Sequence, residues 1–243
     1  DICIHLAARI GGIKYFHNFP ATILDQNSRM ISNVFNSSVK KGVKKLVYIS
    51  SSMVFERAKT VPTPENMIFE SPPPFSHYGF SKLQGEYFCT AYWREYGLKY
   101  VICRPFNAYG PGEIPEDEVG IAHVIPDLIK NILGGSYPLE ILGDGRQIRC
   151  FTYVQDVADA ICLLTFDKRA ECEDFNIGNN RETSIMELAQ ILWRLCERKE
   201  PFAAKNAPPL EFDVQRRAPD ISKIMRLIGW QPKVNLEEGL QIT

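Results

Sequence analysis

KKLVYISS (residues 44–51) and KYVICRPF (residues 99–106) are the two segments that decide the fold. Each is a short apolar run without polar alternation, which is typical of a strand buried on both faces of a sheet. Residues 77–96, which lie between them, are predicted to form a helix that closes at Gly97, because glycine is favoured just past a helix end. The order strand, helix, strand favours a parallel sheet with crossover helices.

The N-terminal part repeats this pattern. Residues 1–8 are a further apolar run, which we expect to form a buried strand, and residues 20–41 carry apolar side chains at helical spacing before Gly42. The alternation predicts an α/β fold, with a Rossmann-like parallel sheet covered by helices on both faces.

Beyond residue 107 the chain changes character, and we expect a smaller α/β substrate-binding C-terminal domain. The predicted elements are a helix at 120–133, a strand–turn–strand unit at 139–154, a helix at 155–166, a strand at 173–178, an amphipathic helix at 184–197 and a short helix that ends at Gly229. The predicted domains are residues 1–107 with 152–178 for the Rossmann-type part, and residues 108–151 with 179–243 for the substrate part.

The composition is that of an ordinary globular protein. The 243 residues are 45% hydrophobic and 23% charged, with a formal net charge of −1. No basic field suited to nucleic acid is visible, and no apolar run approaches the roughly 18 residues that a membrane span requires. We therefore expect neither nucleic acid nor a membrane as a partner.

The cysteines and histidines do not indicate a metal site or a disulfide framework. Seven cysteines are odd in number and widely scattered, without a C-x-x-C pair, and the four histidines are equally dispersed. Most of the cysteines have apolar neighbours. We expect reduced thiols in a cytoplasmic protein and no bound metal.

The chain begins DICIHLAA, with neither an initiator Met nor a signal-peptide pattern, and it enters an apolar strand directly. From the sequence we expect a chain that starts within a domain.

Tyr78 and Lys82 stand four residues apart at the start of the predicted 77–96 helix. The pair is either a proton-transfer device or two surface side chains one turn apart, and the spacing alone does not decide. Ten tyrosines give a chain of this length about half a chance match.

Other signals occur in a fixed order with this pair. They are IHLAA (4–8), YISSSMVF (48–55), YGFSK (78–82), RPFNAYGPG (104–112), GDGRQIRCFTYVQDVADA (143–160), FNIGN (175–179) and DISKIMRLIGWQPKVNLEEGL (220–240). Together they resemble the extended short-chain dehydrogenase/reductase family, specifically its nucleotide-sugar epimerases and dehydratases, such as UDP-glucose 4-epimerase. The resemblance spans essentially the whole chain.

The resemblance implies NAD as cofactor and a nucleoside-diphosphate sugar as substrate, with Ser51, Tyr78 and Lys82 as catalytic residues. Tyr78 would take a proton from a sugar hydroxyl, and the Lys82 charge one turn away would favour the phenolate. Ser51, four positions before Phe55, is favoured over Ser50 and Ser52 as the hydroxyl that binds the reacting group.

The resemblance also implies cofactor and substrate contacts. Residues expected at the cofactor are Leu6, Ala7, Ala8, Asn27, Ile49, Ser50, Tyr78, Lys82 and Pro105. Residues expected at the substrate are Ser51, Asn107, His123, Val124, Arg149 and either Arg216 or Arg217. A guanidinium suits the substrate diphosphate, because its fork matches phosphate oxygens.

This sequence departs from the family pattern at its N-terminal end. The family opens with a strand and a phosphate loop, usually G-x-x-G-x-x-G, whereas Gly11–Gly12, Gly110/Gly112 and Gly143/Gly145 do not supply that spacing. None of them is expected to link a strand to a helix N-terminus. We expect about 60 to 70 residues, two βα units, to be absent, with the nicotinamide half of the site and most of the sugar-nucleotide site retained.

The residues after Ser51 separate the family's reactions. The 4,6-dehydratases carry Asp and Glu there, and the 3,5-epimerising branch carries a cysteine at the second position, whereas this chain has Ser52 and Met53. AARIGGI (7–13) and HVIPDLI (123–129) are nevertheless similar to the 3,5-epimerising branch, whose acid/base histidine matches His123. Without the cysteine, we interpret His123 as structural or substrate-contacting.

What remains is inversion at C4 through a transient 4-keto sugar. The alternatives are NADP-dependent reduction of a 4-keto sugar, 4,6-dehydration, and a non-catalytic nucleotide-binding or scaffold protein on the same fold. A homodimer is expected, because helices 20–41 and 77–96 resemble the pair that family members pack into an intersubunit four-helix bundle.

Overall fold

The computed structural model of the chain describes residues 1–115, 121–209 and 214–243. At its centre is a parallel sheet with the strand order β1-β2-β3-β8. Its strands are β1 (Ile2–His5), β2 (Lys45–Ile49), β3 (Lys99–Pro105) and β8 (Glu173–Ile177). The α/β fold with a Rossmann-like parallel sheet is therefore confirmed.

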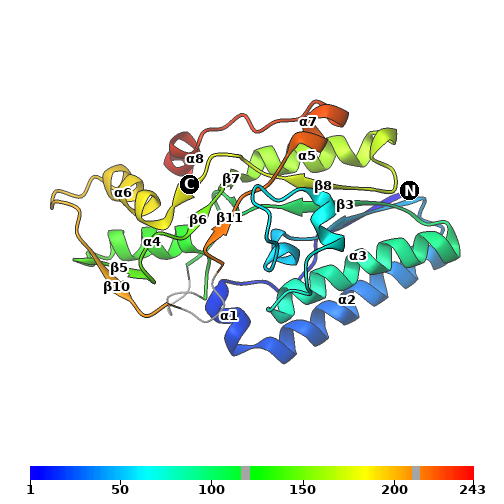
Figure 1. The fold of residues 1–243 in the computed structure, drawn as a ribbon, viewed down its shortest axis with the longest axis horizontal. Helices are drawn as coiled ribbons and strands as arrows, with labels where there is room; N and C mark the ends of the chain where they lie inside the picture. The colour runs from blue at the N-terminus through cyan, green and yellow to red at the C-terminus, as the bar shows by residue number, and fades with distance from the viewer. Residues whose placement is uncertain (116–120, 210–213) are drawn as a thin grey trace.

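Helices cover both faces of the sheet (Figure 1). They are α2 (Pro20–Lys40) and α3 (His77–Tyr96) on one face, and α5 (Val154–Phe166) and α7 (Ser222–Ile228) on the other. Successive side chains of a strand point to opposite faces, so Leu46 and Tyr48 pack toward α2 and α3, and Val47 packs toward α5 and α7. Burial on both faces explains the uninterrupted apolar runs.

The predicted helix boundaries agree closely with the structure. α3 begins after Ser76, whose hydroxyl accepts a 2.9 Å hydrogen bond from the backbone N–H of Gly79, and it ends at Gly97 in the left-handed region (φ 69°). β1 differs from the prediction of a buried strand at residues 1–8. It lies at the sheet edge, and Ile2 and Ile4 are each 40% exposed.

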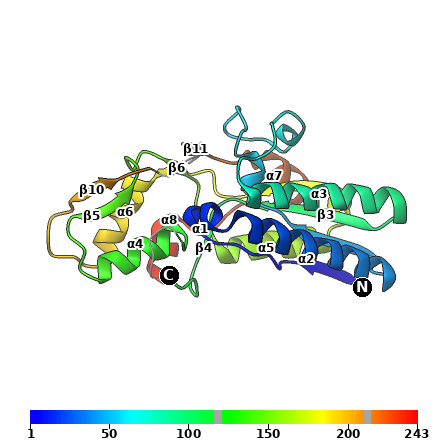
Figure 2. The ribbon, with the colours of Figure 1, turned by 90° about the horizontal axis from the view of Figure 1, so that it is seen from below.

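A second hydrophobic cluster lies beyond the carboxyl edge of the sheet. It is built by α4 (Val124–Leu133), α6 (Ile185–Leu195), α8 (Leu236–Ile242) and β5 (Leu139–Leu142). Figure 2 shows this part extending away from the four-stranded sheet. The domain boundaries proposed from the sequence stay a prediction.

The remaining strands are short. β5 pairs with β10 (Ala204–Ala207), and β4 (Ala108–Tyr109) pairs with β7 (Thr152–Tyr153). β6 (Ile148–Arg149) lies between β9 (Thr183–Ser184) and β11 (Arg216–Arg217). The two strands of the predicted strand–turn–strand unit, β5 and β6, thus belong to different sheets and do not pair with each other.

The remaining helices are short. They are α1 (Ile13–Asn18) and the 3₁₀ helices η1 (Ser52–Phe55), η2 (Glu65–Phe69) and η3 (Lys168–Ala170). Within the described residues, no helix combines the length and apolar character needed to cross a membrane.

The seven cysteines are all free thiols. Cys89, Cys103 and Cys150 are buried, as the apolar neighbours predict, but Cys162 is exposed on α5. Its neighbours Ile161 and Leu164 face the sheet, and Cys162 lies on the opposite side of the helix.

Candidate active site

A cavity of about 440 Å³ lies at the carboxyl ends of β1, β2 and β3. Leu6, Ile49 and Pro105 line it on the sheet side, and Ile125 and Phe151 line it on the side of the second cluster. Open parallel sheets bind ligands at this edge, and the volume is within the range of small-molecule pockets.

All the predicted site residues line this cavity except Ala7, Asn27 and Arg216, the alternative to Arg217. Asn27 is buried on α2, where its Oδ1 accepts a hydrogen bond from the Arg9 backbone N–H (2.6 Å) and its Nδ2 donates to the Arg9 carbonyl oxygen (3.2 Å) and to Ser81 Oγ (3.1 Å). Its amide therefore fixes the loop after β1 and does not reach the cavity. Ala7 lies between two lining residues, Leu6 and Ala8.

Tyr78 is buried at the cavity wall and is 3% exposed. Burial raises the pKa of its phenol to about 12, although a hydrogen bond with Ser51 and the charge of Arg217 act in the opposite direction. The spacing with Lys82 predicts a lowered pKa for the Tyr78 phenol. The structure corrects this expectation, because loss of water around the phenol outweighs the favourable charges.

Lys82 lies one turn further along α3, also buried. Its Nζ donates a 2.8 Å hydrogen bond to the carbonyl oxygen of Ile49 and lies 5.8 Å from the centre of the Tyr78 ring. Burial lowers the pKa of this amine to about 8, and the Glu86 carboxylate acts in the opposite direction. The Tyr78–Lys82 pair is thus an interior pair and not two surface side chains.

The three serines after β2 have different partners. Ser50 Oγ donates to Glu86 Oε1 (2.5 Å), and Ser52 Oγ lies 3.4 Å from Arg217 Nη1. Ser51 accepts a 3.2 Å hydrogen bond from the Met53 backbone N–H and is the serine that bonds the Tyr78 phenol. The geometry therefore favours Ser51 as the hydroxyl next to the phenol.

Two arginines reach the cavity. Arg149 is held by backbone carbonyl oxygens, since its Nη1 donates to Ile148 (2.9 Å) and Val214 (2.6 Å). Arg217 is 9% exposed and lines the cavity. Arg216 forms two hydrogen bonds to Glu182 on the outside, at 2.6 and 2.8 Å. Of the two adjacent candidates, Arg217 is the one at the site.

Asn107, His123 and Val124 also line the cavity. Asn107 has φ 41°, a conformation that Asn tolerates better than most residues, and its Nδ2 donates to the Cys150 carbonyl oxygen (3.2 Å). The His123 ring Nδ1 is hydrogen-bonded to the Glu113 carboxylate. Burial raises the pKa of Glu113, but the bonds and charge of His123 outweigh it, and the pKa lies below its ordinary value.

Sequence reasoning missed three residues. Phe16 on α1 stacks on Tyr78, Glu113 pairs with His123, and Glu86 bonds Ser50. The four-residue spacing after Lys82 could have indicated Glu86. Nothing in the sequence places Phe16, because its contact with Tyr78 joins segments that are distant along the chain, and Glu113 lies in a loop without a periodic pattern, ten residues before His123.

The donor set suits part of a dinucleotide and a sugar. The Lys82 amine and the hydroxyls of Tyr78 and Ser51 are donors of the kind that bind ribose and sugar hydroxyls. Gly11–Gly12 lies between β1 and α1, which corrects the expectation that no glycine pair leads from a strand to a helix. That helix has six residues, and the described residues contain no G-x-x-G-x-x-G cradle for a pyrophosphate.

The described ranges contain no group of three or more His, Cys, Asp or Glu side chains that could hold a metal ion. The polar side chains around the cavity are hydroxyls, amides, an amine, guanidinium groups and carboxylates, the last being Asp127, Glu140 and the Glu113 that pairs with His123.

Comparisons with known proteins agree with this geometry. A family model described as NAD dependent epimerase/dehydratase family matches residues 1–178. The chain is 32% identical to a GDP-L-fucose synthase of Sinorhizobium fredii (98% of this chain, 76% of the relative). It is 35% identical to a putative UDP-glucose 4-epimerase of Methanocaldococcus jannaschii (99% and 75%).

Among solved structures, the chain is similar to a UDP-glucose 4-epimerase of Thermotoga maritima with UDP-glucose. The identity is 34% and the TM-score 0.87, over 100% of this chain and 75% of that one. The chain thus spans about three quarters of the length of these proteins.

Proposed function

The chain belongs to the NAD dependent epimerase/dehydratase family, and on this premise we propose that it inverts C4 of a nucleoside-diphosphate sugar through a transient 4-keto intermediate. The relatives named above carry different activities, a synthase and an epimerase. The choice among reactions therefore rests on this chain's own residues.

One observation carries the proposal. Tyr78, Lys82 and Ser51 converge at the cavity, while the next two positions hold Ser52 and Met53. C4 inversion needs one proton acceptor and a hydroxyl to orient the substrate. Dehydration and 3,5-epimerisation need a further acid or base after Ser51, and neither Ser52 nor Met53 exchanges protons readily near neutral pH.

Each residue has a distinct task in this scheme. The Ser51 hydroxyl holds the sugar C4 hydroxyl against Tyr78, whose oxygen takes the proton and later returns it. Arg217 and the Ser51 hydrogen bond favour the phenolate, opposing the effect of burial. Lys82 would bind ribose hydroxyls of the cofactor, and Leu6, Ala8, Ile49 and Pro105 form apolar walls beside it.

The nicotinamide ring, when bound, supplies the acceptor and then the donor of the C4 hydride. Arg149 and Arg217 would neutralise the substrate diphosphate, since both guanidinium groups line the cavity. Asn107, His123 and Val124 would contact the sugar or diphosphate.

A second candidate is reduction of a 4-keto sugar with NADPH. The finding that favours it is the similarity to a GDP-L-fucose synthase. Reduction would use the same Tyr78, Lys82 and Ser51.

One experiment separates the two reactions. The protein is incubated with UDP-, GDP-, dTDP- and CDP-hexoses and NAD⁺, and the sugars are followed by proton NMR. We expect a C4 epimer of one of them without net change in NADH. If no hexose is converted and a 4-keto sugar causes rapid NADPH consumption, the reductase would replace the epimerase as the proposed function.

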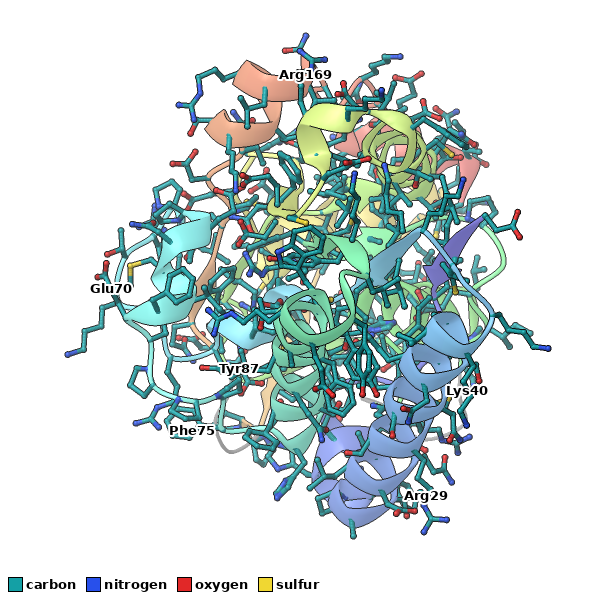
Figure 3. All side chains as sticks on the ribbon, turned by 90° about the vertical axis from the view of Figure 1, so that its right-hand side faces the viewer. Arg29, Lys40, Glu70, Phe75, Tyr87 and Arg169 are labelled. Carbon is teal, nitrogen blue, oxygen red and sulfur yellow. The ribbon has the colours of Figure 1, made fainter. Side chains whose placement is uncertain are left out.

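The assembly we propose is a homodimer formed through α2 and α3. The supporting feature is a pair of exposed aromatic side chains two turns apart on one face of α3, Phe80 and Tyr87, which are 44 and 70% exposed. Figure 3 shows the two helices side by side, with Tyr87, Arg29 and Lys40 labelled on this side of the molecule. Large apolar side chains that gather on an exposed face are typical of an interface.

A further inference from the structure

Three buried titratable side chains follow one another along α3. Tyr78, Lys82 and Glu86 are 3, 5 and 5% exposed, and their four-residue spacing puts them on one face of the helix. The first two belong to the proposed catalytic machinery. Glu86 lies outside the cavity lining and has no role in the scheme above.

Glu86 is tightly held by two partners. Its Oε1 accepts hydrogen bonds from Ser50 Oγ (2.5 Å) and Arg104 Nε (2.8 Å), and its Oε2 accepts one from Arg104 Nη2 (2.7 Å). The two arginine bonds form the bidentate pair that fixes a carboxylate in both position and orientation. Arg104 is in turn paired with Asp174 at 2.7 Å.

Ser50 links the Glu86 carboxylate to the backbone at the end of β2. The residues on either side of Ser50 make the contacts to Lys82 and Tyr78. The Ile49 carbonyl oxygen, one residue before Ser50, accepts the Lys82 hydrogen bond, and Ser51, one residue after it, bonds the Tyr78 phenol. Glu86 therefore ties α3 to the end of β2 at the point where both contacts are set.

Glu86 also supplies negative charge to Lys82. From β1 the amine faces His5, whose pKa burial and the Lys82 charge lower to about 4, so His5 is neutral near pH 7. From β2 it faces the Tyr48 ring (5.7 Å to the centroid) and the Ile49 carbonyl oxygen, and from α3 it faces Tyr78. These groups are neutral, and the Glu86 carboxylate is the anion that acts on the amine.

We propose that Glu86 is a positioning residue of this site, whose carboxylate fixes Ser50 so that Ile49 and Ser51 keep their places beside Lys82 and Tyr78, and whose negative charge opposes the loss of the Lys82 proton. The proposal rests on the proposed function only in assigning Lys82 and Tyr78 to catalysis. The effect on the Lys82 charge is a property of the folded chain and is measurable without turnover.

The test is a pH titration of Lys82 by NMR in protein labelled with ¹³C-lysine, with the signal assigned by its loss in Lys82→Met. Glu86→Gln removes the charge but keeps the shape, so the Lys82 pKa should lie about one pH unit or more below that of the wild type. Glu86→Asp keeps the charge but shortens the side chain by one methylene, so a smaller decrease in the Lys82 pKa is expected. Asp174→Asn is the matched control, because it removes the other carboxylate from Arg104 and should leave the Lys82 pKa unchanged.

An unchanged Lys82 pKa in Glu86→Gln, or in Glu86→Asp if the first variant does not fold, would overturn the proposal and leave Glu86 as a structural partner of Arg104. An equal decrease in Asp174→Asn would also overturn it, because the effect would then come from the network and not from Glu86. Absence of turnover in the wild type, with the predicted order of pKa values intact, would contradict only the proposed function.

Discussion

Phe16 lies flat on Tyr78, with ring centroids 4.6 Å apart and ring planes inclined by 7°. Phe16 comes from the short helix α1, whereas Tyr78 belongs to the first turn of α3. The stacked ring covers one face of the phenol and keeps water from it, which contributes to the burial that raises the pKa of Tyr78.

Phe16→Ala should therefore lower the pKa of Tyr78 from about 12 toward its ordinary value near 10, because water then reaches the phenol. Ultraviolet titration of the tyrosinate, taken as a difference from Tyr78→Phe, measures this pKa. Phe19→Ala is the control, since Phe19 packs against Tyr15 and is 44% exposed. An unchanged Tyr78 pKa in Phe16→Ala would mean that other groups exclude the water.

Stability should depend on pH through Lys82. Its pKa is about 8 in the folded protein and near 10.5 when unfolded, so between these values the unfolded chain binds a proton that the folded protein does not. Unfolding then becomes harder as pH rises, by up to about 1.4 kcal/mol per pH unit from this group. Urea unfolding of wild type and Lys82→Met from pH 7 to 10.5 measures the difference, and equal pH dependence in the two proteins would refute the lowered pKa of the buried amine.

The adjacent arginines should behave differently. Arg217→Gln removes a buried cation from the cavity and should raise KM for the sugar nucleotide roughly 10- to 100-fold, the effect expected for a lost charged hydrogen bond. Arg216→Gln breaks an exposed pair with Glu182 and should change KM little. Steady-state kinetics on both variants decide the assignment, and equal effects would contradict it.

Tyr87 tests the proposed dimer. Light scattering after size exclusion should give twice the 27.7 kDa chain mass for the wild type. Tyr87→Glu puts a charge into an apolar contact and should give the monomer mass, whereas Glu70→Gln, on the exposed end of η2, should not. A monomeric wild type at micromolar concentration would exclude this interface.

The sheet and the paired helices could be predicted from the sequence because their signals are local. Buried strands such as 45–49 are continuous apolar runs, and α3 is bounded by Ser76 and Gly97. The apolar run of β1 does not by itself indicate the exposure of this strand, since an edge strand and a central strand can share the same run. Likewise, no local pattern indicates that β5 pairs with β10 and that β6 pairs with β9 and β11, because these partners lie far along the chain.

The side chains that we propose to be catalytic were identified through motif resemblance, but their electrostatics could not be predicted in this way. The spacing of Tyr78 and Lys82 indicates attraction between a cation and a phenolate, whereas the structure adds burial, which opposes both charges. Asn27 also shows that a motif does not determine the contacts of a side chain. Its position in a motif favours a ligand contact, but its amide is satisfied by the backbone of Arg9.

The measurement that tests the central claim most directly follows deuterium placed at C4 of the hexose that the protein converts. If Tyr78 takes and returns the hydroxyl proton while the same hydride leaves and returns, NMR should show the C4 epimer with its deuterium retained, and Tyr78→Phe should slow conversion by roughly 10²- to 10⁴-fold. Tyr87→Phe, on the same helix but 70% exposed, should convert at the wild-type rate. Loss of deuterium to solvent during inversion, or full activity in Tyr78→Phe, would contradict the account.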